Sequence, residues 1–367
     1  MSILNTGVKN VRNVQKYTIG KGALEGLSSI LESKRIQNSD YVIFFIDEYF
    51  KNNQEILRKL NINLSDHKFF VQTKDEPTTD GIDNILISLK EDNKDKPCAI
   101  VGFGGGATMD VAKAVSNLLT NHGNAENYQG WDLVLNPGIF KIGIPTISGT
   151  GAEATRTCVL TNKKSGLKLG MNSDHTVFDQ IIMDPELTST VPRNQYFYTG
   201  MDAYIHCIEA LAGSYRNSIG DAYSRETINL CRKVFLDGDM MTEENRERLM
   251  VASYLGGCAI ATSYVGLVHP LSAALSVVLG LHHCVANCIV MNSMSDYYKE
   301  EFEEFQLMVR KQGIEIPRDV CKDLNDDQFQ KLYESTIIHE KPLVNALGPD
   351  FKEVLTYERV TNIFKKM

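Results

Sequence analysis

The sequence lacks the features that mark several classes of protein. Acidic residues outnumber basic ones, the formal net charge is −8, and the basic residues form no cluster. This balance gives no support to a nucleic-acid partner. No apolar run approaches the roughly 20 residues that cross a bilayer, so no membrane association is expected. There is also no internal repeat and no low-complexity linker.

Disulfide and metal patterns built on cysteine are missing as well. The eight cysteines are scattered, no Cys-x-x-Cys pair occurs, and the chain begins without a signal-peptide pattern. We therefore expect reduced thiols in a cytoplasmic protein. Cys284 and Cys288 flank a histidine-containing segment. We interpret them as packing residues, with a ligand role as the alternative.

The first half of the chain alternates between strand-like and helix-like segments. We expect strands at Tyr41–Ile46, Lys68–Thr73, Cys98–Phe103 and Lys141–Thr146, with helices at Lys51–Leu60, Asp80–Glu91 and Val111–Leu119. Alternation of this kind predicts a Rossmann-like, doubly wound parallel sheet. Ligands of such sheets bind at the carboxyl ends of the strands.

The second half changes character after Asp184-Pro-Glu-Leu187. We expect helices at Tyr198–Ala212, Asp221–Leu236, Glu243–Thr262, Leu267–Leu279, Ala286–Tyr298, Asp326–Glu340 and Thr356–Lys366. No comparable strand-like run appears there. The 367-residue length suits two domains. The expected organisation is an α/β dinucleotide-binding domain over residues 1–190 and an all-α metal-binding domain over residues 191–367.

Two features follow expected strands and favour a dinucleotide. Asp47 follows the first of them; a carboxylate there accepts hydrogen bonds from a ribose 2′-hydroxyl and repels a 2′-phosphate, which favours NAD over NADP. A helix N-cap or a solvated acid is the alternative. The run Gly102-Phe-Gly-Gly-Gly-Ala-Thr-Met-Asp110 lies between a strand and a helix, where backbone N–H groups can bind phosphate. It is neither a GxGxxG motif nor a Walker loop.

A third glycine-containing segment, Ser148-Gly-Thr-Gly-Ala-Glu153, follows the next strand. Its small polar residues would let the backbone approach a cofactor closely. The alternative is an ordinary strand–helix loop in which Ser or Thr caps the next helix.

Four side chains suggest a metal site in the helical half. Asp202 and His206 are four residues apart and so share one helix face, while His269 and His283 lie in apolar surroundings. Together they suit Zn²⁺ or Fe²⁺; a helix-surface pair and two core histidines are the alternative. Fourteen helical residues would span about 21 Å, so the helix that holds His269 must end before His283. Gly280 is the natural break, and we expect His283 to fold back toward His206.

The ordered motifs of the chain resemble those of the iron-containing, group III alcohol dehydrogenases over nearly its whole length. They are Asp47 after the first strand, Gly104-Gly-Gly-Ala-Thr-Met-Asp110, Pro145-Thr-Ile-Ser-Gly-Thr-Gly-Ala-Glu153, Asp184-Pro-Glu-Leu187, Gly200-Met-Asp-Ala203 with His206, His269, and His283 with Asn287. The resemblance implies this family's fold, shared with dehydroquinate synthases, and suggests a homodimer.

The resemblance also implies the site residues. The first three motifs would bind NAD(P), through Asp47, Gly104, Gly105, Gly106, Thr108, Asp110, Thr146, Ser148 and Thr150. Asp202, His206, His269 and His283 would hold Fe²⁺ or Zn²⁺ and act in catalysis through it. The expected reaction is hydride transfer from a primary alcohol to the nicotinamide. Because the ligating histidines must be neutral, activity should fall at acid pH.

The chain departs from the family pattern at several positions. Ala273 stands where a second histidine is usual, so the proton-relay role of that histidine does not carry over to this chain. The proton acceptor would instead be the ribose hydroxyl or His282, although we expect His282 at the surface. Cys284 stands where Gly is usual, and Ala107 where Ser is common.

Three segments look most like the branch that oxidises C8 of 3-deoxy-D-manno-octulosonate to an aldehyde, on a route to an 8-amino sugar of lipopolysaccharide: Tyr128–Asp132, Ser148–Thr157 and Asn345–Asp350. Such a sugar-acid substrate needs a cation for its carboxylate. Arg156 and Lys168 are the candidates, with a surface or structural charge as the alternative. Rival functions are a dehydrogenase of simple alcohols or diols, a dehydroquinate-synthase-like lyase, and a binding protein without catalysis.

Overall fold

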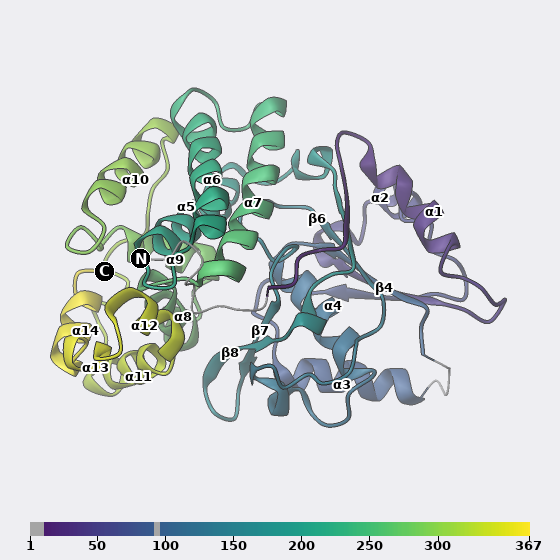
Figure 1. Ribbon diagram of the computed structural model, residues 1–367, viewed down its shortest axis with the longest axis horizontal. Helices are drawn as coiled ribbons and strands as arrows, with labels where there is room; N and C mark the ends of the chain where they lie inside the picture. Colours follow the sequence, from purple (N-terminus) through teal and green to yellow (C-terminus); the bar gives the residue numbers. More distant parts are fainter. Residues whose placement is uncertain (1–10, 92–95) are drawn as a thin grey trace. The chain divides into compact units, whose positions relative to one another are not determined.

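The computed structural model describes residues 11–91 and 96–367 and divides into two compact units (Figure 1). The α/β unit comprises residues Arg12–Ile147 and Ala152–Thr190; the helical unit contains Ser148–Gly151 and Val191–Met367. Apart from the segment Ser148–Gly151, the boundary between the two units thus falls between Thr190 and Val191. The sequence did not indicate that four residues from the first half belong to the helical unit.

A six-stranded parallel sheet forms the α/β unit. It consists of β1 (Lys16–Ile19), β2 (Val42–Asp47), β3 (His67–Val71), β4 (Ala99–Gly104), β6 (Lys141–Pro145) and β9 (Gln180–Met183), in the order β1-β9-β6-β4-β2-β3. Helices α1 (Leu27–Glu32), α2 (Gln54–Lys59), α3 (Thr79–Glu91) and α4 (Gly106–Leu118) connect the strands. The predicted doubly wound sheet is confirmed. Strand β2 is buried along almost its whole length, which explains its continuous apolar sequence.

The order of the strands places a switch point between β2 and β4. Strand β2 pairs with β3 on one side and with β4 on the other, so the chain runs outward from β2 to β3 and then crosses back past β2 to β4. Ligands of open α/β sheets bind outside the carboxyl ends of strands at such a point. Asp47 ends β2 and Gly104 ends β4. The two sequence-predicted cofactor features therefore flank one switch point.

A second, three-stranded sheet was missed by the sequence analysis. It contains β5 (Gly130–Trp131), β7 (Thr157–Asn162) and β8 (Leu167–Asn172), and β7 and β8 form an antiparallel hairpin. Buried and half-buried residues alternate along β7. Its apolar run, Cys158-Val-Leu160, is only three residues long, shorter than the runs used to find the buried strands.

The helical unit is built from ten α-helices in its described part. They are α5 (Arg193–Ala212), α6 (Ser218–Leu236), α7 (Glu243–Ser263), α8 (Val268–Leu279), α9 (His283–Met291), α10 (Lys299–Gln312), α11 (Asp326–Ile337), α12 (Glu340–Leu347), α13 (Phe351–Val354) and α14 (Tyr357–Phe364). The expected helix to Tyr298 is wrong, since α9 ends at Met291. Helix α10 was not predicted, although Phe305, Met308 and Val309 are buried on it at helical spacing.

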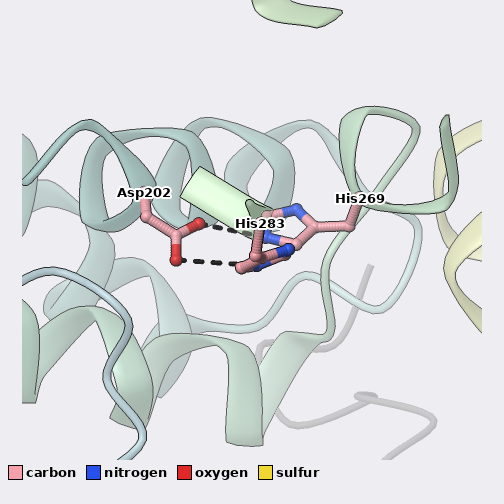
Figure 2. Close-up of side chains that lie close together, drawn as sticks. All are labelled: Asp202, His269 and His283. Atoms are coloured by element: carbon pink, nitrogen blue, oxygen red, sulfur yellow. Dashed lines mark ion pairs between the residues drawn. The ribbon is translucent and has the colours of Figure 1, made fainter. Parts of the chain in front are cut away.

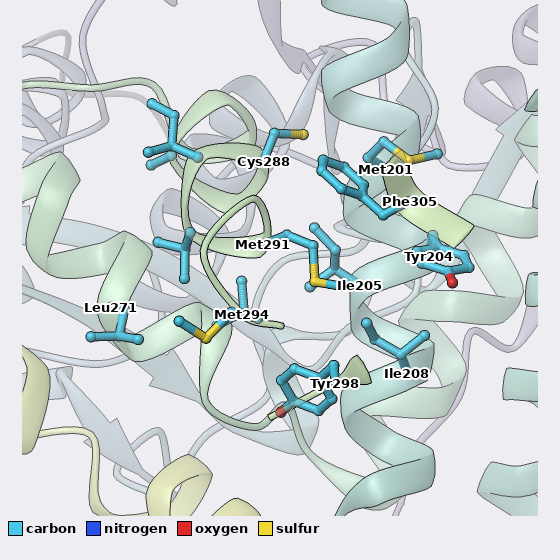
Figure 3. Close-up of a cluster of buried hydrophobic side chains, with 14 of the residues drawn as sticks. Met201, Tyr204, Ile205, Ile208, Leu271, Cys288, Met291, Met294, Tyr298 and Phe305 are labelled. Atoms are coloured by element: carbon cyan, nitrogen blue, oxygen red, sulfur yellow. The ribbon is translucent and has the colours of Figure 1, made fainter. Parts of the chain in front are cut away.

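Helix α5 runs through the core of this unit (Figure 3). Met201, Tyr204, Ile205 and Ile208 pack with Met291 and with residues of α8 and α10 in one buried cluster. A helix that is apolar on several faces is a buried helix. The polar residues that α5 carries are thereby brought into the interior.

Seven of the eight cysteines are buried, and all eight are free thiols. Among the described residues, no single helix has the length and apolar character needed to cross a membrane. Helices α7 and α8 meet that criterion only as a pair, and they are bent by 105° at the break between them.

Candidate metal centre

Asp202 and His206 lie in the middle of α5 and face the interior. Asp202 is fully buried and His206 is 3% exposed. Because the two residues are one turn apart, Nε2 of His206 lies 3.5 Å from Oδ1 of Asp202. A buried carboxylate is costly unless it is paired or binds a metal, so this pair marks a polar centre inside the helical core.

The second part of the centre comes from the starts of α8 and α9. His269 is the second residue of α8, and His283 is the first residue of α9. Gly280 ends α8 in the left-handed conformation, with φ +68°. The predicted break at Gly280 is therefore confirmed. The turn brings the rings of His269 and His283 to 5.5 Å between centroids.

Three of the four predicted ligands converge closely (Figure 2). Asp202, His269 and His283 each offer one atom, and these atoms lie within 4.8 Å of one another. Nε2 of His269 is 3.3 Å from Oδ1 of Asp202, and Nε2 of His283 is 3.7 Å from Oδ2. His206 is outside this group of three, but its ring stacks on that of His269 at 4.7 Å.

These separations fit a metal ion. Two ligand atoms that are each about 2.1 Å from a tetrahedral ion lie about 3.4 Å apart. The distances from Asp202 to His269, His206 and His283 are 3.3, 3.5 and 3.7 Å. The donor set of imidazole and carboxylate suits Zn²⁺ and Fe²⁺ alike.

Burial and charge set the protonation states of the centre. Burial alone would raise the pKa of Asp202, but His206, His283 and His269 together hold this pKa well below its usual range. Burial lowers the pKa of His206 to about 4, so that imidazole is neutral at pH 7. Burial also acts to lower the pKa of His269, but Glu209 and Asp202 outweigh it and raise this pKa to about 10.

Sequence reasoning missed the side chains that contact the proposed ligands and hold them in place. Glu209 of α5 is buried and contacts Nδ1 of His269. Asn287 of α9 donates from Nδ2 to Oδ1 of Asp202 at 2.7 Å. The thiol of Cys284 lies 3.7 Å from the other oxygen of Asp202. Glu209 was detectable in principle, because it follows Asp202 by seven residues and shares its helix face.

The expected cofactor residues of the α/β unit lie around the start of α4. A Cβ on Gly104 would lie 2.7 Å from Thr108 and 3.0 Å from the Cβ of Asp47, so only glycine fits. Gly105 caps α4 without a side-chain hydrogen bond, which leaves the first N–H groups of the helix to other partners. The buried hydroxyl of Thr108 has no hydrogen-bond partner among the described residues.

Other predicted cofactor residues have structural partners. The carboxylate of Asp47 accepts hydrogen bonds from Tyr49 N at 3.0 Å and from Thr73 Oγ1 at 3.3 Å, so Asp47 is an N-cap, and its contact with a ribose stays a prediction. Asp110 accepts from Val159 N at 3.0 Å, and burial raises its pKa to about 7. Thr146 donates its backbone N–H to Gly104 O at 3.1 Å.

The segment Ser148–Gly151 packs against helices of its own unit. A Cβ on Gly149 would lie 1.6 Å from the carbonyl oxygen of Thr199 on α5, and one on Gly151 would lie 2.6 Å from Cα of Gly257 on α7. The close backbone approach that we expected toward a cofactor is therefore made toward two helices. The Ser148 hydroxyl is buried without a described hydrogen-bond partner.

The two candidate cations for a substrate carboxylate are paired within the α/β unit. Arg156 pairs with Asp132 and with Asp174, and Lys168 lies 2.9 Å from Glu76. Both side chains thus act as structural charges. His282 is exposed, as expected, whereas Ala273 is buried on α8.

Comparison with known proteins agrees with this architecture. A family model described as iron-containing alcohol dehydrogenase matches residues 14–185, and the C-terminal model of the same family matches residues 196–333. The chain belongs to the iron-containing alcohol dehydrogenase family. The family named from the sequence motifs is thereby confirmed. NAD and a divalent metal are the cofactors of this family.

Individual relatives are similar in sequence to parts of the chain. The sulfoacetaldehyde reductase of Bilophila wadsworthia is 34% identical over 223 residues, which are 60% of this chain and 56% of the reductase. The NAD-dependent methanol dehydrogenase of Bacillus methanolicus is 27% identical over 74% of this chain and 71% of that enzyme. The chain thus spans little more than half the length of the reductase that it matches.

Solved structures share the fold of nearly the whole chain. The sulfoacetaldehyde reductase of Bifidobacterium kashiwanohense, solved in complex with NAD⁺, has a TM-score of 0.79 at 20% identity, covering 97% of this chain and 98% of that one. This likeness confirms the predicted fold, with a Rossmann-like half and a helical half.

Proposed function

We propose that the chain is a metal-dependent, NAD-linked dehydrogenase that converts a primary hydroxyl group to an aldehyde. The observation that carries this proposal is the convergence of Asp202, His269 and His283 on one point inside the helical unit. We assign His206 as the fourth ligand, because its Nε2 faces the same carboxylate. A divalent ion held there would act as a Lewis acid on the substrate oxygen.

The residues of the centre suit this reaction electrostatically. Asp202 supplies one negative charge and the histidines would bind as neutral imidazoles, with His269 releasing its second proton when the ion binds, so the site would keep a net positive charge for an oxygen that loses its proton. Asp202 is held in place by Asn287 at 2.7 Å. In the α/β unit, we assign the phosphates of NAD to the uncapped start of α4 and its ribose to Asp47.

The finer proposal concerns the substrate. We propose C8 of 3-deoxy-D-manno-octulosonate, whose oxidation gives an aldehyde that an aminotransferase can convert to an 8-amino sugar of lipopolysaccharide. Its support is the sequence resemblance of residues 128–132, 148–157 and 345–350 to that branch. The relatives are named for smaller substrates, sulfoacetaldehyde and methanol, so a simple alcohol or aldehyde is the second candidate. We further propose a cytoplasmic location, consistent with the eight free thiols, and a homodimer, as the family resemblance suggests.

The substrate assay compares these candidates directly. Protein reconstituted with Fe²⁺ or with Zn²⁺ is mixed with NAD and either 3-deoxy-octulosonic acid or a panel of simple primary alcohols and diols, and NADH is followed by absorbance. NADH from the sugar acid alone supports the finer proposal. NADH from simple alcohols only would retain the dehydrogenase and discard the sugar acid. Turnover of a cyclase substrate without net NADH would favour a lyase.

The metal assignment has its own test. Replacement of Asp202 or His269 by Ala should abolish stoichiometric metal binding and turnover while NAD binding, measured by fluorescence titration, persists. A matched control is Glu304→Gln, because Glu304 pairs with Arg232 and Tyr204 in the same unit without contacting the proposed ligands. Full turnover in a metal-free variant would refute the metal-dependent mechanism.

A further inference from the structure

Glu209 joins two helices through both of its carboxylate oxygens. It lies on α5, fully buried. Its Oε1 accepts a hydrogen bond from the backbone N–H of Val268 at 2.5 Å, and its Oε2 contacts Nδ1 of His269. Val268 and His269 are the first two residues of α8. One carboxylate of α5 therefore contacts both the backbone and a side chain at the start of α8.

The start of α8 depends on this carboxylate because it has no cap of its own. Its N-cap residue, Leu267, makes no side-chain capping hydrogen bond. The first N–H groups of a helix need partners from elsewhere and favour a nearby negative charge. The preceding loop fits closely on Glu209, since a Cβ on Gly266 would lie 3.3 Å from the Cβ of Glu209. Glu209 thus fixes where α8 begins relative to α5.

The same carboxylate sets the proton position on His269. Nε2 of this ring faces Asp202 at 3.3 Å, in the proposed ligand cluster. An imidazole that binds a metal through Nε2 carries its hydrogen on Nδ1, and a hydrogen-bond acceptor beside Nδ1 stabilises that tautomer. Oε2 of Glu209 occupies this place.

The geometry points to Glu209 as the positioning residue of the metal site. Two donors, Val268 N–H and His269 Nδ1–H, converge on it, and a carboxylate supplies an acceptor oxygen for each. An amide supplies one acceptor and one donor group. A glutamine at this position must either lose the contact to the α8 backbone or present N–H to Nδ1, which favours the tautomer that cannot bind metal through Nε2. This inference rests on the proposed metal site.

The test compares Glu209→Gln with Glu304→Gln. Glu304 on α10 also accepts two side-chain donors, Tyr204 at 2.7 Å and Arg232 at 2.6 Å, but lies outside the ligand cluster. Zn²⁺ affinity is measured by competition with a chromophoric chelator, the coordination by the visible spectrum of the Co²⁺ form, and the melting temperature on the metal-free proteins. Loss of an outer partner of a ligating histidine weakens metal binding about 10–100-fold.

We expect Glu209→Gln to lose Zn²⁺ affinity in that range and to change the Co²⁺ spectrum, while Glu304→Gln keeps the parental affinity and spectrum. Melting alone cannot separate the variants, because both replace a carboxylate that accepts two donors by an amide. If Glu209→Gln melts lower but binds Zn²⁺ and Co²⁺ like the parent, Glu209 only caps α8 and the inference is overturned. If the parent protein binds no stoichiometric metal, the proposed metal site is wrong, and the inference that rests on it is wrong as well.

Discussion

Gly149→Ala separates the two roles that a glycine in the Ser148–Gly151 segment can have. If glycine is needed for approach to a cofactor, the variant should fold normally and lose NAD binding. The structure predicts a packing defect instead. The added Cβ would lie 1.6 Å from the carbonyl oxygen of Thr199 and 2.3 Å from its carbonyl carbon. These are backbone atoms inside α5, so no side-chain rotation relieves the overlap.

The expected cost has two parts. Gly149 has φ +144°, a conformation that costs a non-glycine residue about 1–3 kcal/mol. Forced displacement of packed backbone costs about 1–3 kcal/mol more. A total of about 4 kcal/mol in a unit of this size corresponds to a fall of about 8–16 °C in melting temperature.

Gly313→Ala is the matched control in the same unit. Gly313 also has positive φ, +64°, but a Cβ added there would meet no atom within 4 Å. It should therefore show only the conformational cost of about 1–2 kcal/mol. The assay is thermal unfolding of the metal-free proteins, with NAD affinity measured in parallel. Equal melting of the two variants, with NAD affinity lost only in Gly149→Ala, would refute the packing explanation.

Three further predictions concern the α/β unit. Lys113 is fully buried and donates to Thr155 O and Thr157 O, both at 2.9 Å, so Lys113→Met leaves these carbonyls unsatisfied and should lower the free energy of unfolding by about 1–3 kcal/mol in urea titrations. Asp47→Ser keeps a capping oxygen for Tyr49 but removes the charge that repels a 2′-phosphate, so kcat/KM for NADP relative to NAD should rise at least about tenfold. Burial raises the pKa of Asp110 from 3.8 to about 7; between these values the unfolded chain ionises and the folded chain does not, so stability falls as pH rises. The melting temperature of Asp110→Asn relative to the parent should therefore increase from pH 5 to pH 8, and a constant difference would contradict this assignment.

Local sequence patterns were sufficient to predict those features of the structure that neighbouring residues determine. The buried strand β2 follows from its unbroken apolar run, and the end of α8 follows from Gly280, which adopts φ +68°. The pairing of Asp202 with His206 follows from helical spacing. These features need only periodicity and backbone preferences, which neighbouring residues determine.

Features that depend on contacts between distant segments were not predicted. Glu209 is one acidic residue among many in the sequence, and its role appears only when Val268 and His269 lie against it. Gly149 looked like a cofactor-binding glycine, but its requirement comes from Thr199, fifty residues later. Arg156 and Lys168 are suitable cations for a substrate until their acidic partners are known. In each case the decisive neighbour is remote in sequence.

One face of α5 connects these observations. Thr199, Asp202, His206 and Glu209 are spaced by three, four and three residues, which places them within about 80° on a helix of 3.6 residues per turn. That face contacts Gly149, supplies two proposed ligands and anchors the start of α8. A shift of α5 that relieves the overlap in Gly149→Ala must therefore move Asp202 and Glu209 as well. We infer that this variant should also bind metal more weakly, whereas Glu209→Gln, which leaves Thr199 in place, should not disturb the packing of Gly149.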